Sequence, residues 1–238
     1  MSIEINRKKS KSFWLTFFYR LHKLLPISKK AKFRLFLQWE WIFDRLAHEA
    51  SFQNYSEKDH PFRIYFHKFI LNYLPKDSII LDLGCKQGDI AAGLATSAKK
   101  VVGVDHDKVA ISEARKKYQA PNLEFIHEDA FKYLDQTNLE FDVLILSHLL
   151  EHLDDRKPFL ERLKKHFKFV YIEVPDFDKT YLNHYRKDIG EKLIYTDNDH
   201  VIEFDREDLQ QLLKECRINI IAAEYRFGIQ RLWCEIKG

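Results

Sequence analysis

The chain contains little cysteine: there are three such residues in 238, namely Cys85, Cys216 and Cys234. Their number is odd and no Cys-x-x-Cys pair occurs, so the sequence supports neither a disulfide framework nor a thiolate zinc site. Because reduced cysteines are typical of the cytoplasm, we expect a cytoplasmic protein.

Glycine and proline are also scarce, with 7 and 6 residues, whereas 45% of the residues are hydrophobic. This composition excludes low-complexity and disordered chains. Long hydrophobic runs are missing as well. Residues 13–19 are interrupted by Thr16 and closed by Arg20, far short of the roughly 20 residues that a membrane span needs. No small-residue cleavage site follows them, so we predict no signal peptide.

Acidic residues are nearly absent from residues 1–39, which carry ten Lys/Arg and only Glu4, a net charge of +9. The whole chain carries +3, so the remaining residues sum to −6. The basic character therefore belongs to the N-terminal segment. The length allows one sizeable domain with an appendage, and we divide the chain into a helical extension, 1–74, and a domain, 75–238.

Hydrophobic periodicity predicts helices in the extension, with breaks at Pro26 and Pro61. The first helix has a basic side and one apolar face, made of Phe13, Trp14, Phe17, Phe18, Leu21, Leu24 and Leu25. This pattern is compatible with a cap on the main domain or with peripheral membrane contact through residues 12–25. Nucleic-acid contact is the least favoured alternative.

The second helix, about residues 30–50, has apolar residues on two nearly opposite sides. One side can pack on the core of the domain, and the other, made of Phe33, Leu37 and Trp41, then needs a separate partner. A separate apolar face predicts a partner, and a homodimer is the simplest one.

From Ser78 onward short apolar runs alternate with helical segments, which is typical of an α/β fold with a parallel sheet. The predicted strands are 79–83, 100–104, 123–127, 141–146, 169–174, 218–225 and 231–236. The predicted helices are 90–97, 108–118, 130–134 and 206–216. The last two strands flank a short turn and should form an antiparallel hairpin.

The first of these strands ends in a glycine turn, with Gly84 and Gly88 four residues apart. A glycine turn between a parallel strand and a helix lets a ligand approach the backbone at the carboxyl edge of the sheet. The spacing differs from Gly-x-Gly-x-x-Gly, which disfavours a dinucleotide site. A plain strand-to-helix turn is the alternative interpretation.

The next two strands also end in acidic residues. Asp105 lies 23 residues after Asp82 and is suited to accept hydrogen bonds from both hydroxyls of a ribose. Asp129 and Ala130 follow the third strand and are suited to hold an adenine. Each aspartate has an alternative role as the cap of the following helix.

Together these motifs resemble the class I S-adenosylmethionine-dependent methyltransferases. The resemblance covers about residues 79–236 and includes Leu149-Leu150-Glu151-His152, a stretch similar to the quinone-biosynthesis methyltransferases. It implies a Rossmann-like seven-stranded sheet in the order 3-2-1-4-5-7-6, with strand 7 antiparallel. It also implies S-adenosylmethionine as cofactor, bound by Asp82, Gly84, Cys85, Gly88, Asp105, His106, Asp129, Ala130 and Ser147. Lys86 stands where most members have glycine, so it predicts a positive φ or a crowded cofactor site.

Methyl transfer to a hydroxyl needs a base near the acceptor, and histidine is suited to this role near neutral pH. We favour His152 or His200 as the catalytic base, with His148, Glu151 and Asp176 as further candidates. No metal is assigned, although the segment 148–152 is an alternative site for a divalent cation.

The stretch 176–200 is long, aromatic and polar, which is typical of a substrate lid and suits a sugar. Together with residues 173–176 and 60–63, it resembles bacterial methyltransferases of surface-polysaccharide clusters. We therefore expect O-methylation of a glycan or glycolipid precursor, at the inner face of the membrane. The alternatives are a quinone-type small-molecule methyltransferase and a catalytically silent, cofactor-binding scaffold.

Overall fold

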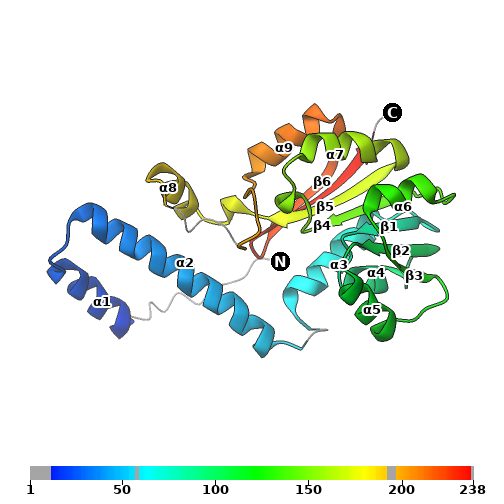
Figure 1. Cartoon of the computed structure of the whole chain (residues 1–238). Helices are drawn as coiled ribbons and strands as arrows, with labels where there is room; N and C mark the ends of the chain where they lie inside the picture. The colour runs from blue at the N-terminus through cyan, green and yellow to red at the C-terminus, as the bar shows by residue number, and fades with distance from the viewer. Residues whose placement is uncertain (1–11, 57–58, 192–196, 237–238) are drawn as a thin grey trace. The chain divides into compact units, whose positions relative to one another are not determined.

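The computed structural model describes residues 12–56, 59–191 and 197–236 (Figure 1). Two predicted segments fall partly outside these ranges, namely residues 1–11 of the extension and 192–196 of the lid. The chain divides into two compact units, Met1–Leu46 and Ala47–Gly238. Within the described ranges, no helix combines the length and hydropathy needed to cross a membrane.

Two helices occupy the N-terminal region, as predicted. Helix α1 (Phe13–Leu24) begins where Ser12 Oγ accepts the Leu15 N–H at 3.2 Å. Helix α2 (Lys29–Asn54) begins in the same way, with Ser28 Oγ accepting the Ala31 N–H at 3.1 Å. These serine caps satisfy backbone donors that have no partner within the helix.

One mixed sheet contains seven strands in the order β3-β2-β1-β4-β5-β7-β6. The strands are β1 (Ile79–Leu83), β2 (Lys100–Asp105), β3 (Leu123–His127), β4 (Val143–Ser147), β5 (Phe169–Pro175), β6 (Ile218–Arg226) and β7 (Ile229–Ile236). Strand β7 runs antiparallel to β5 and β6, and the remaining pairs are parallel. The predicted Rossmann-like sheet and its strand order are confirmed.

Helices cover both faces of this sheet (Figure 1). On one face lie α3 (Pro61–Tyr73), α4 (Asp89–Leu94) and α5 (Lys108–Lys117), and on the other lie α6 (Ala130–Gln136), α7 (Arg156–Leu163) and α9 (Arg206–Glu215). Alternate residues of β1 serve the two cores, since Ile80 packs with the first group and Leu81 with the second. The parallel strands are thus buried on both faces.

Several boundaries differ from the prediction. Helix α7 was not predicted. It contains Pro158, which lies in the first turn, where a proline removes no helical hydrogen bond. Helix α4 ends at Leu94 instead of at the predicted residue 97. Just after this end, Thr96 Oγ1 donates a hydrogen bond to the Gly93 carbonyl. Helix α3 begins at the predicted break, Pro61, and ends at Tyr73 within the predicted helical extension, whereas helix α8 (Leu182–Asp188) was not singled out in the sequence.

Candidate functional site

The loop between β1 and α4 brings the backbone to the carboxyl edge of the sheet. Gly84 has a φ of +72°, and its N–H donates to the Val104 carbonyl at 2.9 Å. Gly88, the N-cap of α4, has a φ of +79°, and a Cβ there would lie 2.4 Å from ring carbons of Phe125. Only glycine fits both this backbone conformation and this space.

Lys86 adopts a φ of +45°, as the sequence predicted for a side chain at this position. Its N–H donates to Asp105 Oδ2 at 2.9 Å, which ties the loop to the end of β2. The lysine side chain is exposed. Strain in the backbone, rather than a buried side chain, is therefore the consequence of a lysine here.

Asp82 lies near the end of β1 and is only 1% exposed. Its Oδ2 atom accepts no hydrogen bond from any residue that the structure describes. Burial, with a further contribution from Asp105, raises the pKa of Asp82 to about 7. A buried carboxylate oxygen without a partner is costly, so this position favours a ligand that supplies a donor or a positive charge.

Asp105 is buried at the end of β2 and accepts backbone N–H groups on both oxygens. Lys86 donates to Oδ2, and Asp107 donates to Oδ1 at 2.8 Å. The α5 helix is capped by Asp107 rather than by Asp105, so the capping alternative for Asp105 is wrong. Each carboxylate oxygen retains capacity for a further donor such as a hydroxyl. His106 is next to it, with its side chain 92% exposed.

Asp129 caps helix α6, since its Oδ1 accepts the N–H groups of Phe131 and Lys132 at 3.0 Å each. Ala130 is the first residue of that helix. The N–H of Glu128 donates to the Asp105 carbonyl at 3.1 Å, which joins the ends of β2 and β3. The adenine-binding role of Asp129 and Ala130 remains a prediction.

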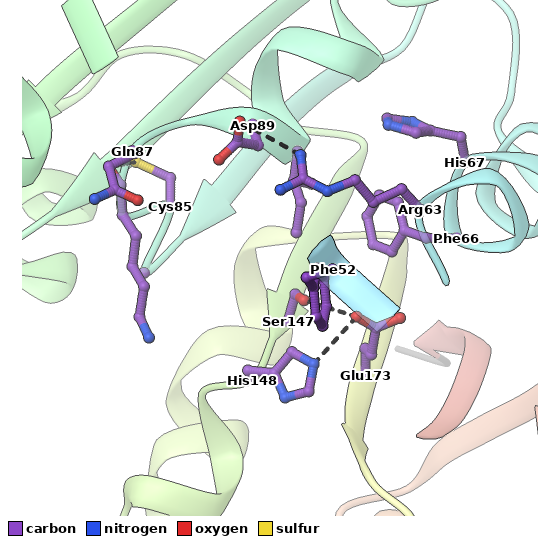
Figure 2. Close-up of a pocket in the computed structure, with 13 residues that line it drawn as sticks. Phe52, Arg63, Phe66, His67, Cys85, Gln87, Asp89, Ser147, His148 and Glu173 are labelled. Carbon is purple, nitrogen blue, oxygen red and sulfur yellow. Dashed lines mark hydrogen bonds and ion pairs between the residues drawn. The ribbon is translucent and has the colours of Figure 1, made fainter. Parts of the chain in front are cut away.

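A cavity of about 300 Å³ opens beside the glycine loop (Figure 2). Its walls come from the end of α2, from α3, from the loop and from the ends of β4 and β5. The lining residues are Phe52, Arg63, Phe66, His67, Gly84, Cys85, Lys86, Gln87, Asp89, Ile90, Ser147, His148 and Glu173. Three of the predicted cofactor residues, Gly84, Cys85 and Ser147, are among them.

Glu173 is the most strongly bonded group of this cavity. Its Oε2 accepts Tyr171 Oη–H at 2.6 Å and Arg231 Nε–H at 2.7 Å. Its Oε1 accepts Ser147 Oγ–H at 3.1 Å, a contact visible in Figure 2. Burial alone would raise the pKa of Glu173, but His148, Arg231 and Tyr171 lower it, so the carboxylate is ionised.

His148 lies between two carboxylates at the end of β4. Its Nδ1 is 3.0 Å from Glu151 Oε1, and its Nε2 is 3.4 Å from Glu173 Oε1. Burial would lower the pKa of His148, but the two glutamates raise it to about 10. The imidazole is therefore protonated at neutral pH and cannot accept a proton from an acceptor there.

His67 has the opposite electrostatic environment. Burial lowers the pKa of His67 and the Arg63 charge lowers it further, against an opposing contribution from Glu173. Its ring packs over Gly93, because a Cβ there would lie 1.9 Å from the ring. His67 is thus a neutral imidazole in the cavity wall near pH 7.

The predicted catalytic histidines lie together, but neither is among the residues that line this cavity. The rings of His152 and His200 meet edge to face, with centroids 4.7 Å apart. His200 Nδ1 is 2.9 Å from Glu203 Oε1, and His152 Nδ1 is 3.3 Å from Asp199 Oδ2. Potential ligand atoms of Glu151, His152 and His200 lie within 4.8 Å of one another. Their catalytic role and the absence of a metal remain predictions.

The described part of the stretch after β5 is anchored by buried polar groups. Asp176 is 3% exposed and accepts both Arg206 Nη2–H at 2.7 Å and Nε–H at 3.3 Å. In α8, Asn183 Nδ2 donates to the Phe177 carbonyl at 2.7 Å. Tyr181 and Tyr185 are exposed and meet edge to face. The role of this segment as a sugar-binding lid remains a prediction.

Sequence reasoning missed the cavity residues that precede β1, namely Phe52, Phe66 and His67, together with Arg231 of β7. The pattern His60-Pro61-Phe62-Arg63 marked the start of α3, but nothing in it assigned the helix to the cavity. Glu173 could have been recognised, since it is an acidic residue within an otherwise apolar strand and such a charge needs a buried partner.

The fold is similar to that of known methyltransferases. Residues 80–169 match the family model described as a methyltransferase domain. Magnesium protoporphyrin IX methyltransferase from Synechocystis PCC 6803, solved with S-adenosylhomocysteine, aligns with a TM-score of 0.56 at 19% identity, over 73% of this chain and 81% of that chain. The N-methyltransferase NodS from Bradyrhizobium japonicum WM9 gives 0.56 at 15% identity, over 75% and 89%. The chain therefore has the class I methyltransferase fold, as predicted, and its residues 80–169 are similar to a methyltransferase domain.

Curated relatives match this chain at about 30% identity, but only over part of their length. An uncharacterized methyltransferase of Mycobacterium tuberculosis is 30% identical over 84 residues, which are 35% of this chain and 42% of the relative. The mitochondrial ubiquinone biosynthesis O-methyltransferase of Dictyostelium discoideum is 30% identical over 151 residues, 56% of this chain and 46% of the relative. The chain thus matches less than half the length of each.

Proposed function

We propose that this protein is an S-adenosylmethionine-dependent methyltransferase. The observation that carries the proposal is Asp82, whose buried and unpartnered oxygen lies at the end of β1 beside the glycine turn. The amino group of the cofactor is the kind of positively charged donor that such an oxygen requires. The spare acceptor capacity of Asp105 suits the ribose hydroxyls, and Asp129 and Ala130 suit the adenine.

The cofactor supplies an activated methyl group, so the chain mainly has to hold and orient the acceptor. Phe52 and Phe66 provide apolar walls to the cavity. Ser147, His148 and Glu173 provide polar groups at the ends of β4 and β5 that fix the orientation of an acceptor. Both ring nitrogens of the protonated His148 face carboxylates, so this residue would position Glu173 and Glu151 at the acceptor side of the cavity.

A hydroxyl acceptor must lose a proton as the methyl group is transferred. We retain His152 and His200 as proposed bases, for an acceptor that extends from the cavity along the segment after β4. His67 is a further candidate, because it lines the cavity and is neutral near pH 7.

For the acceptor we propose a glycan or glycolipid precursor. The exposed Tyr181 and Tyr185 support this choice, since aromatic rings stack on the apolar faces of sugars. A quinone-type small molecule is the second candidate, and the Dictyostelium relative named for ubiquinone biosynthesis favours it. A silent scaffold is the third, motivated by the strained backbone of Lys86.

Calorimetric titration with S-adenosylmethionine and S-adenosylhomocysteine tests the cofactor site. We expect binding in the micromolar range, weakened about tenfold or more in Asp105→Asn, because one charged hydrogen-bond partner contributes about 1.5–3 kcal/mol. Asp135→Asn is the matched control, since this aspartate is 63% exposed on α6 and should bind normally.

Absence of binding to the unaltered protein would refute the proposed function. Tight binding with no transfer to any sugar, glycolipid or quinone acceptor would instead favour the scaffold.

A further inference from the structure

Helix α1 presents large apolar side chains to solvent along its whole length. None of its twelve residues is buried, and Phe13, Trp14 and Leu24 are 72%, 65% and 77% exposed. Soluble proteins rarely expose a continuous apolar surface of this kind without a partner. The exposed surface continues onto the first part of α2, through Phe33 and Phe36.

The charge around this surface has one sign. Residues 12–39 contain six Lys/Arg and no acidic residue. The six are Arg20, Lys23, Lys29, Lys30, Lys32 and Arg34. After Glu4 the next acidic residue is Glu40, so the basic and the apolar exposed residues of 12–39 occupy a part of the chain without acidic side chains. A partner for this part must accept bulky apolar groups and compensate positive charge at once.

We propose that residues 12–39 dock on the surface of an anionic lipid bilayer. Aromatic and leucine side chains enter the boundary between headgroups and acyl chains, while lysine and arginine contact anionic headgroups. A helix of twelve residues is about 18 Å long, too short to cross a hydrocarbon core of about 30 Å, so α1 lies along the surface.

Other occupants fit these observations less well. A second copy of the chain would bring the same six positive charges together. A nucleic acid would compensate the charge, but it would leave Leu21 and Leu24 in water. Docking would add a lipid surface to the partners of the proposed methyltransferase. It rests on the proposed function in one respect, because a docked enzyme would meet a lipid-linked acceptor at the membrane.

Helix α1 offers a matched pair of variants on its two sides. Trp14 and Phe17 belong to the apolar face, whereas Leu15 and Tyr19 lie on the other side and are 70% and 59% exposed. Both pairs are exposed, so W14S/F17S and L15S/Y19S should leave the fold equally intact. Circular dichroism and the thermal midpoint of the full chain check this for each variant.

The experiment is co-sedimentation of the full chain with vesicles of phosphatidylcholine, with and without about one third phosphatidylglycerol. We expect binding to the anionic vesicles, about tenfold weaker for W14S/F17S and within about threefold of the unaltered protein for L15S/Y19S. Raising the salt concentration should weaken binding, because it screens the attraction to the headgroups.

No binding to anionic vesicles, or equal loss in both variants, would overturn the proposal. Sedimentation equilibrium without lipid is run in parallel, and a dimer that only W14S/F17S disrupts would assign the face to a second copy instead. Tighter binding to a single-stranded oligonucleotide than to vesicles would assign it to nucleic acid. Cofactor titration of the same samples is independent of all these outcomes, so failure of docking and failure of the proposed function remain distinguishable.

Discussion

His148 shows how a single residue is constrained by its surroundings. It has a φ of +50°, which is rare for a residue other than glycine, and its N–H donates to the Glu173 carbonyl at 2.9 Å. Its ring is held between Glu151 and Glu173, and Glu173 is held in turn by Arg231 and Tyr171. Strain of this kind persists where surrounding contacts fix the residue, and such positions concentrate at functional sites.

The charge on His148 predicts a pH dependence of stability. Its pKa is about 10 in the folded protein and about 6.5 when unfolded, so its contribution is complete below about pH 6.5 and is lost as the pH rises to 10. We expect the difference in unfolding free energy between the unaltered protein and His148→Gln to fall by about 2 kcal/mol across this range, allowing for the exposed third of the side chain.

Urea unfolding of both proteins at pH 6.5 and 9.5 measures this difference. Glu173 and Tyr171 titrate in both proteins, and their contributions cancel in the difference to the extent that glutamine preserves their contacts. A difference that does not change with pH would show that His148 is neutral in the folded protein.

At the scale of an element, the turn from β1 to α4 depends on close packing against β3. Gly88 has both a positive φ and a neighbour, Phe125, at the position of a Cβ. Gly190 also has a positive φ, +66°, but none of the residues that the structure describes lies within 4 Å of its Cβ position. Alanine at Gly190 would therefore meet backbone strain alone, whereas alanine at Gly88 would meet both backbone strain and a steric clash.

We expect Gly190→Ala to lower the unfolding free energy by about 1 kcal/mol, the cost of a positive φ for alanine. Gly88→Ala adds overpacking against the Phe125 ring and should cost about 3 kcal/mol, with cofactor affinity reduced about tenfold. Denaturant unfolding and calorimetric titration of both variants test this. Equal losses in the two variants would mean that Phe125 moves aside and that packing does not define the turn.

At the scale of the whole molecule, the two compact units differ in what they contain. Both hydrophobic cores and every residue lining the cavity lie in the unit Ala47–Gly238. The unit Met1–Leu46 contributes exposed apolar side chains instead, and its eleven Lys/Arg against three acidic residues give it a net charge of +8. Cofactor binding and membrane docking should therefore be separable.

Removal of residues 1–28 tests this separation. We expect the truncated protein to lose binding to anionic vesicles while its S-adenosylhomocysteine affinity stays within about twofold and its thermal midpoint within a few degrees, since no core residue is removed. Titration, vesicle sedimentation and a thermal scan on one preparation provide the comparison. Loss of cofactor affinity together with docking would show that the N-terminal helices support the cofactor site.

The sequence by itself determined the local features of this protein. The alternation of strands and helices, the glycine turn after β1 and the acidic residue at the end of β2 follow from hydrophobic periodicity and turn chemistry, which act over a few residues. The amphipathic basic helix is equally local, because its pattern is contained in residues 12–25. The resemblance that these motifs carry supplied the strand order.

Only the tertiary structure decided which side chains share the cavity. Helix α3 places Arg63 and His67 there, and β7 places Arg231 behind Glu173, 58 residues away in the sequence. His148 and His152 are close in the sequence, but only His148 lines the cavity. A positive φ at the end of β4 and two buried glutamates determine where the His148 ring points and keep it charged. Burial and contacts between distant segments set these properties, and neither is encoded in the spacing of residues along the chain.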